Sequence, residues 1–246
     1  EDRLAFSAVF ELDERAQVVN EWFGRTLIHS DRRFTYEEAQ ERIETGKGDF
    51  AEEIGVLQDL AVKLRDERFR KGGIDFNTEE VQFELAEDGT PLRVVVKVMR
   101  DSNRLIEDFM LLANVRVARF LANPPKGKEH LPGVGRRTSV YRVHDKPDPE
   151  KLAQLRLFVE RFGLEMEKPT AGNAEQAIRD LLQAAAGNAG ENVIKTMAIR
   201  SMAKAEYHVE NIGHYGLAFP FYTHFTSPIR RYPDVMVHRL LQHYLD

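Results

Sequence analysis

The sequence predicts an α+β fold, and three observations support this class. Segments in which apolar and polar side chains alternate, the pattern of half-buried strands, occur in pairs around short polar turns. Longer segments with helical periodicity lie between these pairs. Strand and helix segments do not alternate regularly, which favours separate hairpins and helices over a doubly wound parallel sheet. The chain has 246 residues, of which 42% are apolar, so it can form a core in one large domain or two small ones.

The first half of the chain is expected to form two hairpins and three helices. The glycines at 72–73 end the second helix, and Glu87–Thr90 supplies the turn of the second hairpin. The third helix is strongly apolar and ends before Pro124–Pro125. In chain order, the expected elements are strands at 3–12 and 16–29 around Leu12–Arg15, helices at about Tyr36–Glu44 and Phe50–Arg70, strands at Val81–Leu85 and Leu92–Met99, and a helix at Asn103–Leu121.

The second half is expected to be mostly helical. The stretch Pro125–Arg137 is rich in glycine, proline and lysine and is expected to be a mobile loop, because little in it could be buried. Pro149 suits the first turn of an amphipathic helix. The expected elements are a strand at Val140–Val143 and helices at about Asp148–Phe162, Ala174–Ala185, Glu191–Ala203 and Asp234–Tyr244.

Charge and cysteine content limit the possible environments and partners. The net charge of −5 argues against a uniformly basic surface for nucleic acid, although a local basic channel is compatible with it. The chain has no cysteine, which excludes disulfides and thiolate metal sites and suits a reducing compartment such as the cytoplasm. No apolar run approaches the roughly 20 residues of a membrane helix, and no signal peptide is visible.

The segment 224–239 contains two prolines around a pair of arginines, Arg230 and Arg231. Prolines are costly inside a helix, so this backbone is expected to present particular side chains at one point. Ser227 can cap a helix whose first residue is Pro228, and free amides at a helix start attract phosphate. Arginine also offers a planar fork that matches phosphate oxygens. The segment therefore predicts an anion clamp for a phosphodiester or a nucleotide.

A longer string around this segment closely resembles the C-terminal signature of the ribonuclease II/ribonuclease R (RNB) family of 3′→5′ exoribonucleases. The resemblance rests first on Glu210–Ala218 and Tyr222–Asp234. Further pieces follow in the family's order: Asp2–Ser7, Phe34–Ala39, Gly73–Phe76, Asn103–Asn114 and Val140–His144. The resemblance covers essentially the whole chain and favours the ribonuclease R side of the family. It implies an RNB-type nuclease domain in which antiparallel hairpins pack with long helices around an RNA channel.

The family's metal-binding aspartate cluster lies upstream of the element that resembles Asp2–Ser7, and oligonucleotide-binding domains flank the family's nuclease domain. The resemblance therefore implies that residues 1–246 form a partial RNB catalytic domain without these parts. Two divalent ions, expected to be Mg²⁺, would orient the attacking water and stabilise the leaving oxygen, with their ligands upstream of this chain. The 246-residue chain alone is expected to be inactive.

The resemblance also implies roles for individual residues. Arg230 and Arg231 would lie beside the scissile phosphate, and Glu107 would lie near the terminal ribose. Tyr36 and Phe76 would stack on bases of single-stranded RNA along the channel. From the residues alone, each of these two aromatics is better explained as part of the core.

Glu107 is the strongest single acidic candidate. Its helix is apolar on nearly every side and is expected to be buried, and a buried carboxylate needs a partner. Arg104, Glu107 and Asn114 fall on one helical stripe and could face one cleft, where Asn114 would contact RNA. An ion pair between Glu107 and Arg104 is the structural alternative. Asp108 is expected to point elsewhere and to be solvated.

The polar side chains around the arginine pair have both functional and structural interpretations. His224 could donate to a phosphate or order the loop. Thr226 and Ser227 could be phosphate donors to RNA or only helix caps. Arg230 could pair with Asp234 one helical turn later, which would orient it.

A metal site made of histidines is not expected. His214, His224 and His238 are spaced by ten and fourteen residues, which matches no compact zinc pattern. His238 is expected to be a structural hydrogen-bond partner instead. No metal ligand is therefore assigned within the chain.

These observations favour one function and leave a second open. The resemblance implies metal-dependent hydrolysis of single-stranded RNA from its 3′ end, with release of nucleoside 5′-monophosphates. The alternative is a non-catalytic RNA-binding or scaffold module with the same fold. A phosphatase or another phosphodiesterase would explain the arginines but not the length of the match.

Overall fold

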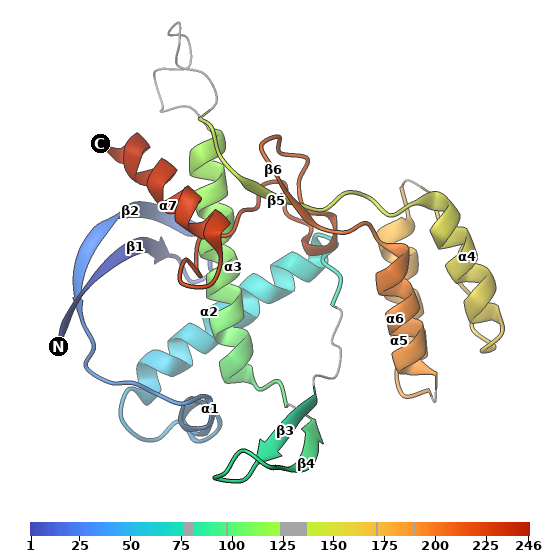
Figure 1. Ribbon diagram of the computed structural model, residues 1–246, viewed down its shortest axis with the longest axis horizontal. Helices are drawn as coiled ribbons and strands as arrows, with labels where there is room; N and C mark the ends of the chain where they lie inside the picture. Colours follow the sequence, from blue (N-terminus) through green and yellow to red (C-terminus); the bar gives the residue numbers. More distant parts are fainter. Residues whose placement is uncertain (76–80, 97, 124–136, 171, 189) are drawn as a thin grey trace, which may run out of the picture. The chain divides into compact units, whose positions relative to one another are not determined.

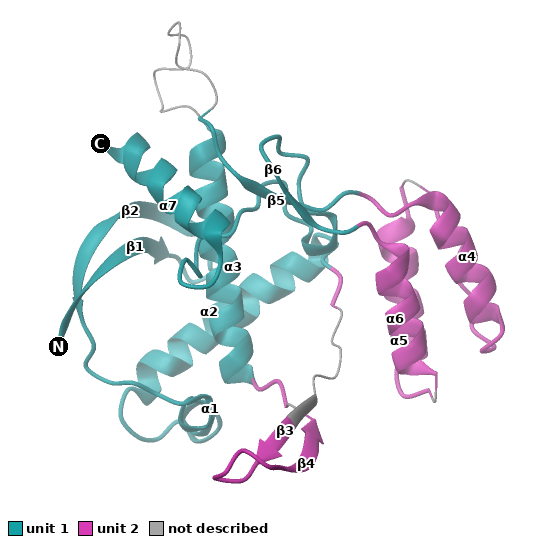
Figure 2. Ribbon diagram, viewed as in Figure 1, with its two compact units in different colours: residues 1–73, 101–145, 204–246 teal, residues 74–100, 146–203 magenta. Residues whose placement is uncertain are grey.

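A computed structural model describes residues 1–75, 81–96, 98–123, 137–170, 172–188 and 190–246 (Figure 1). These ranges contain seven α-helices and three two-stranded antiparallel sheets, which confirms the predicted α+β class. The chain divides into two compact units (Figure 2). Unit 1 comprises Glu1–Gly73, Asp101–Asp145 and Lys204–Asp246, and unit 2 comprises Ile74–Arg100 and Lys146–Ala203.

Unit 1 begins with the hairpin of β1 (Asp2–Leu12) and β2 (Val18–His29), as the alternating pattern predicts. Asp13 shapes the turn between the strands, because its Oδ1 accepts hydrogen bonds from the amides of Arg15 and Gln17 at 2.9 and 2.8 Å. A short acidic side chain that bonds to nearby backbone amides is a common way to fix such a turn.

Three helices of unit 1 lie within about two residues of their predicted bounds. They are α1 (Tyr36–Thr45), α2 (Ala51–Arg70) and α3 (Asp101–Ala122). A capping box starts α1: the side chains of Thr35 and Glu38 each accept a hydrogen bond from the other's amide. α3 contacts both α1 and α2 (Figure 1).

The core of unit 1 lies where α3 meets the β1–β2 hairpin and the final helix α7 (Tyr232–Leu245). Burial of side chains of this size stabilises the fold by about 1.5–3 kcal/mol each. The buried members of this core are Phe23, Ala113, Val117, Leu121, Phe225, Val237 and Leu241.

A small sheet of β5 (Tyr141–Val143) and β6 (Glu206–His208) completes unit 1, together with the single turn of 3₁₀ helix Tyr215–Leu217. The strand at β5 is confirmed, whereas β6 was not expected. Glu206–His208 contains no β-branched residue, whereas the predicted strand Val140–Val143 contains two valines, so the sequence signal for a strand is weaker at β6.

The expectation of a helix capped by Ser227 and opened by Pro228 is wrong, because α7 starts at Tyr232. Residues 228–230 form a separate turn, in which the Ser227 carbonyl accepts the amides of Arg230 and Arg231 at 3.3 and 3.1 Å. A helix opened at residue 228 could not continue through Pro233, which lacks an amide hydrogen and would clash with the preceding turn.

Unit 2 contains the hairpin of β3 (Val81–Leu85) and β4 (Pro91–Val96) and the helices α4 (Pro149–Glu160), α5 (Ala174–Ala185) and α6 (Glu191–Ser201). All five elements were expected from the sequence. Asp148 caps α4 by accepting the amide of Glu150 at 2.8 Å. α6 packs against both α4 and α5, with apolar side chains such as Leu155, Ile178 and Ile194 fully buried.

Two expectations fall outside this description. The predicted loop Pro125–Arg137 lies, apart from Arg137, outside the described residues, and so does Phe76. Among the helices that the structure describes, none combines the length and apolar character needed to cross a membrane.

Candidate functional site

The central element of the candidate site is α3, and α1 is attached near its start. Ser102 donates its hydroxyl to the Tyr36 carbonyl at 2.8 Å, and its amide donates to Gln40 Oε1 at 3.0 Å. Tyr36 is 47% exposed and lines a cavity of about 420 Å³ together with Leu105 and Ile106. Tyr36 therefore lies beside the turn of α3 that carries the next residue, Glu107.

The two adjacent acids of α3 have the opposite environments to those expected. Asp108 is buried and forms ion pairs with Arg65 at 2.8 Å and Arg68 at 3.9 Å, both from α2. Burial still raises the pKa of Asp108, although both arginines act in the other direction. Glu107 is exposed, and no ion pair joins it to Arg104 in the part of the chain that is described.

The prediction of a buried Glu107 and a solvated Asp108 is therefore wrong. α2 presents its two arginines to the side of α3 on which Asp108 lies, and this contact turns Glu107 toward solvent. An exposed carboxylate can accept hydrogen bonds from the hydroxyls of a ligand, so Glu107 stays a candidate for contact with a ribose.

Asn114, two turns further along α3, fixes the segment that leads to the arginine pair. Its Oδ1 accepts the amide of Phe225 at 2.9 Å, and its Nδ2 donates to the Tyr222 hydroxyl at 3.3 Å. Asn114 is 2% exposed, so these bonds lie in the core. His238 Nε2 lies 2.8 Å from the Phe225 carbonyl, which confirms a structural hydrogen bond for this histidine. The position of Asn114 favours a positioning role over the direct RNA contact that was expected.

Asp234, at the start of α7, organises the segment 227–231, which is called the arginine turn below. It is fully buried, and its Oδ1 accepts the Ser227 amide at 2.8 Å and the Arg231 guanidinium at 2.9 Å. The pairing of Asp234 with Arg230 is therefore wrong, and Arg231 is the partner. Arg230 is exposed, and its guanidinium lies 3.5 Å from the Ser227 hydroxyl. The turn thus presents one arginine held by an acid and one directed to solvent.

The two hydroxyls before the turn have different environments. The hydroxyl of Thr226 is buried and has no hydrogen-bond partner among the described residues. Ser227 uses its backbone rather than its side chain to order the turn, since its amide bonds to Asp234 and its carbonyl accepts two amides. The sequence prediction that both hydroxyls meet RNA stays a prediction.

His224 lies beside the turn and is neutral near pH 7. Burial lowers the pKa of His224 to about 4, and the positive charge of Arg231 adds to this shift. Its Nδ1 lies 2.7 Å from the hydroxyl of Tyr207 on β6. When that hydroxyl donates, Nε2 carries the imidazole proton, so His224 can offer an N–H group but no positive charge.

Two members of this region were not identified from the sequence. The guanidinium of Arg142 on β5 lies 4.7 Å from the ring centroid of Tyr207, and its charge acts on His224. The signal available in the sequence was weak: a single arginine in one three-residue strand and a tyrosine in another.

Electrostatic effects connect Glu107 with the arginine turn. Burial is the main cause of the raised pKa of the Tyr222 hydroxyl, while Arg231 lowers this pKa and Asp234 and Glu107 raise it further. The interaction energy of two charges falls as the distance between them grows, so the charges that act on this one buried hydroxyl lie around it. Glu107 and the turn therefore lie on the same region of unit 1.

The described residues do not provide a magnesium site of their own. They contain no group of three or more histidine, aspartate or glutamate side chains arranged to hold a metal ion. Hard divalent cations need several oxygen ligands, so the described side chains alone do not fit such an ion.

The fold and the site define a mixed helix-and-hairpin protein that presents an arginine pair and an exposed carboxylate from one helical scaffold. The RNB domain family model matches residues 1–246. This chain therefore belongs to the RNB domain family, and the resemblance stated from the sequence is confirmed.

Individual relatives agree with this membership. Ribonuclease R 1 of Lactococcus lactis is 33% identical over 98% of this chain, and the match covers 29% of that protein. A protein of Arabidopsis thaliana named "Inactive exonuclease DIS3L2" is also 33% identical over 98% of this chain and 24% of its own length. The chain thus spans less than a third of these relatives.

Among solved structures, Mycoplasma genitalium RNase R in complex with ribose-methylated single-stranded RNA has the same fold. The TM-score is 0.83 and the sequence identity is 26%, over 98% of this chain and 37% of that one. The RNB-type fold expected from the sequence is therefore confirmed.

Proposed function

We propose that this chain is part of a 3′→5′ exoribonuclease that hydrolyses single-stranded RNA from its 3′ end and releases nucleoside 5′-monophosphates. The arginine turn carries the proposal. Asn114 and Asp234 fix this turn from the core, and it presents Arg230 to solvent and Arg231 in a fixed ion pair. Relatives named as ribonucleases, and a structural neighbour solved with single-stranded RNA, support an RNA substrate.

In this proposal, Arg230 meets the phosphate that is cleaved. It is exposed, and its charge is not neutralised by an ion pair with another described residue. A cation held where charge develops in the transition state lowers the barrier without a further cost of reorganisation. Arg231 supplies the second guanidinium, and Asp234 keeps it in place.

Glu107 and Tyr36 are proposed to hold the terminal nucleotide. The exposed carboxylate of Glu107 can accept hydrogen bonds from ribose hydroxyls, and a group that reads the 2′-hydroxyl is what distinguishes RNA from DNA. Tyr36, half exposed beside the same turn of α3, offers an aromatic face to a base. Phe76 is proposed as a second stacking residue from the resemblance alone.

Residues upstream of this chain are proposed to bind divalent cations, and Mg²⁺ is the expected ion. Bound there, they would supply activated water and charge stabilisation. The proposed location is the cytoplasm, which the absence of cysteine favours.

The test is replacement of Arg230 by alanine in the full natural protein. Release of mononucleotides from 3′-labelled single-stranded RNA should fall at least about a hundredfold, because one positioned charge in the transition state is lost. Arg239→Ala is a matched control, since Arg239 is also exposed and lies on α7. The control should retain activity within about twofold, and neither variant should change the unfolding transition. Wild-type turnover by Arg230→Ala would exclude the clamp.

A non-catalytic RNA-binding or scaffold module is the second candidate. It is favoured by the relative that is named as inactive. The same assay separates the two functions. RNA that is bound by the full natural protein but never shortened, with or without Mg²⁺, would favour the module.

A further inference from the structure

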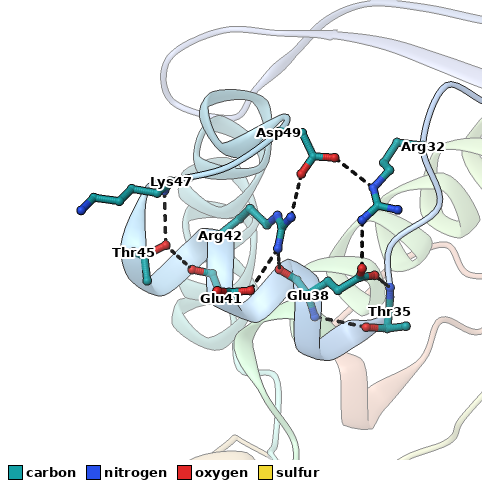
Figure 3. A network of polar contacts seen from close by, with 8 residues as sticks. All are labelled: Arg32, Thr35, Glu38, Glu41, Arg42, Thr45, Lys47 and Asp49. Carbon is teal, nitrogen blue, oxygen red and sulfur yellow. Dashed lines mark hydrogen bonds and ion pairs between the residues drawn. The ribbon is translucent and has the colours of Figure 1, made fainter.

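The segment before α1 is held by a closed ring of charged side chains, shown in Figure 3. Asp49 bonds to two arginines at once: Oδ2 accepts from Arg32 Nε at 2.9 Å and Oδ1 accepts from Arg42 at 2.6 Å. Arg32 continues the ring to Glu38 Oε1 at 2.9 Å, and Arg42 returns to the Glu38 carbonyl at 3.2 Å. Asp49 is the one residue of this ring whose carboxylate accepts hydrogen bonds from both arginines.

The ring is connected directly to the residue before Tyr36. The second carboxylate oxygen of Glu38 accepts the Thr35 amide at 2.8 Å, while the Thr35 hydroxyl accepts the Glu38 amide at 3.2 Å. Glu38 therefore joins the helix cap and the ring through its two oxygens. From the other side, the Tyr36 carbonyl accepts the Ser102 hydroxyl of α3 at 2.8 Å. Tyr36 is thus fixed between the ring and α3.

The aromatic side chain of Phe34 lies beside both arginines of this arrangement. The guanidinium carbons of Arg32 and Arg42 lie 4.9 and 5.4 Å from the centroid of the Phe34 phenyl group. The phenyl group of Phe50 packs edge-on against that of Phe34, with 6.2 Å between the two centroids. Gly48 adopts φ +106°, and a Cβ there would lie 3.3 Å from Arg42 Nε. The backbone and the aromatic contacts therefore restrict where both guanidinium groups can lie.

The charges of the ring compensate one another, which separates it from the arginine turn. Two guanidinium groups face the carboxylates of Asp49 and Glu38, and Arg42 also lies 3.1 Å from Glu41. Such a ring attracts a phosphate only weakly. Arg42 is only 14% exposed and the ion pairs form one network, so the arrangement can stabilise this segment of the chain.

We propose that the ring of Arg32, Glu38, Arg42 and Asp49 is a positioning device that sets the Tyr36 side chain beside Glu107 for the terminal nucleotide of RNA. The inference rests on the proposed function, because the role of Tyr36 toward RNA belongs to that function. The ring residues act through Tyr36 and are positioning residues that do not contact RNA themselves.

The experiment is a double-mutant cycle in the full natural protein. Binding of 5′-fluorescein-labelled single-stranded RNA is followed by anisotropy in EDTA for the wild type, Asp49→Asn, Tyr36→Ala and the double variant. Stacking on an aromatic side chain changes affinity by roughly 5- to 150-fold per base, so a displaced Tyr36 should weaken binding by about fivefold in Asp49→Asn. The double variant should bind as weakly as Tyr36→Ala alone, because the ring then has nothing left to position.

Two further variants make the cycle decisive. Asp59→Asn makes the same charge change at an exposed position of α2 and should bind like the wild type. Arg32→Gln opens the ring from its other side and should repeat the effect of Asp49→Asn if that variant folds poorly. Wild-type affinity in both ring variants, or losses that multiply with that of Tyr36→Ala, would overturn the inference while leaving the proposed function intact. Absence of RNA binding by the wild type would instead refute the proposed function, before any variant is compared.

Discussion

The bonds of Asn114 lead to a quantitative prediction for Asn114→Ala. The substitution leaves the Phe225 amide in the core without an acceptor and removes the donor to the Tyr222 hydroxyl. A buried polar group without a partner costs about 1–3 kcal/mol, and the long bond to Tyr222 adds roughly half of one ordinary hydrogen bond. The segment 222–226 should therefore open more easily by about 2 kcal/mol or more.

Hydrogen exchange measures this local opening directly. A change of about 2 kcal/mol corresponds to exchange of the Phe225 amide that is about thirtyfold faster, because each 1.4 kcal/mol is a factor of ten. Mass spectrometry of peptides that cover residues 222–226 reports this rate even when other domains unfold separately. Turnover of RNA should fall as well, since a displacement of the arginine turn by about 1 Å can cost a hundredfold.

Asn123→Ala is the matched control for this prediction. Asn123 lies just after the same helix and is exposed, and its side chain donates to the Arg119 carbonyl at 2.9 Å. Its replacement should change stability by less than about 0.5 kcal/mol. If Asn114→Ala exchanged at the wild-type rate and kept its activity, the reasoning that α3 positions the arginine turn would be refuted.

Two more predictions concern stability. Asp108→Ala should lower the free energy of unfolding in urea by about 3–5 kcal/mol, because Arg65 and Arg68 lose the acid that faces them. Glu107→Ala, at the exposed neighbouring position, should have almost no effect. Equal effects of the two substitutions would show that the two acids are wrongly placed. Burial lowers the pKa of His214 from an ordinary 6.5 to about 3. Between pH 6.5 and pH 3, the unfolded chain therefore binds a proton at this histidine that the folded chain does not, and stability is lost as the pH falls through this range. Unfolding free energies at pH 6 and pH 5 should therefore differ by about 1.2 kcal/mol more in the wild type than in His214→Asn. Equal differences in the two proteins would contradict this assignment.

Most elements could be predicted because their signals are local. The capping box of Thr35 and Glu38 starts α1 at the expected residue, and alternating side chains gave both long hairpins. β6 was missed because Glu206–His208 contains no β-branched residue, whereas the predicted strand that it pairs with contains valines. The expected helix start at Ser227 failed for a different reason. Pro233 prevents a helix opened at residue 228 from continuing, because it lacks an amide hydrogen and would clash with the preceding turn.

The candidate site shows the same limit at single residues. The sequence around Glu107 is apolar on nearly every side of the helix, so periodicity could not decide which of two adjacent acids points inward. Arg65 and Arg68 decide it, and they lie on another helix, 43 and 40 positions earlier in the chain. Likewise, helical spacing pointed to Arg230 as the partner of Asp234, and only the geometry of the turn shows that the partner is Arg231.

These contacts explain why the arginine turn, Glu107 and Tyr36 form one site although they are distant in sequence. Ser102 reaches Tyr36 across 66 positions, and Asn114 reaches Phe225 across 111. Both bonds start from α3, on either side of Glu107, so a single rigid helix sets the spacing of the three groups. A change that bends or shifts α3 should therefore alter all three positions together, whereas a change in the ring around Asp49 should affect Tyr36 alone. Activity and affinity measured for the two kinds of variant should differ accordingly: loss of Asn114 should act chiefly on turnover, through Arg230, and loss of Asp49 chiefly on RNA affinity, through Tyr36.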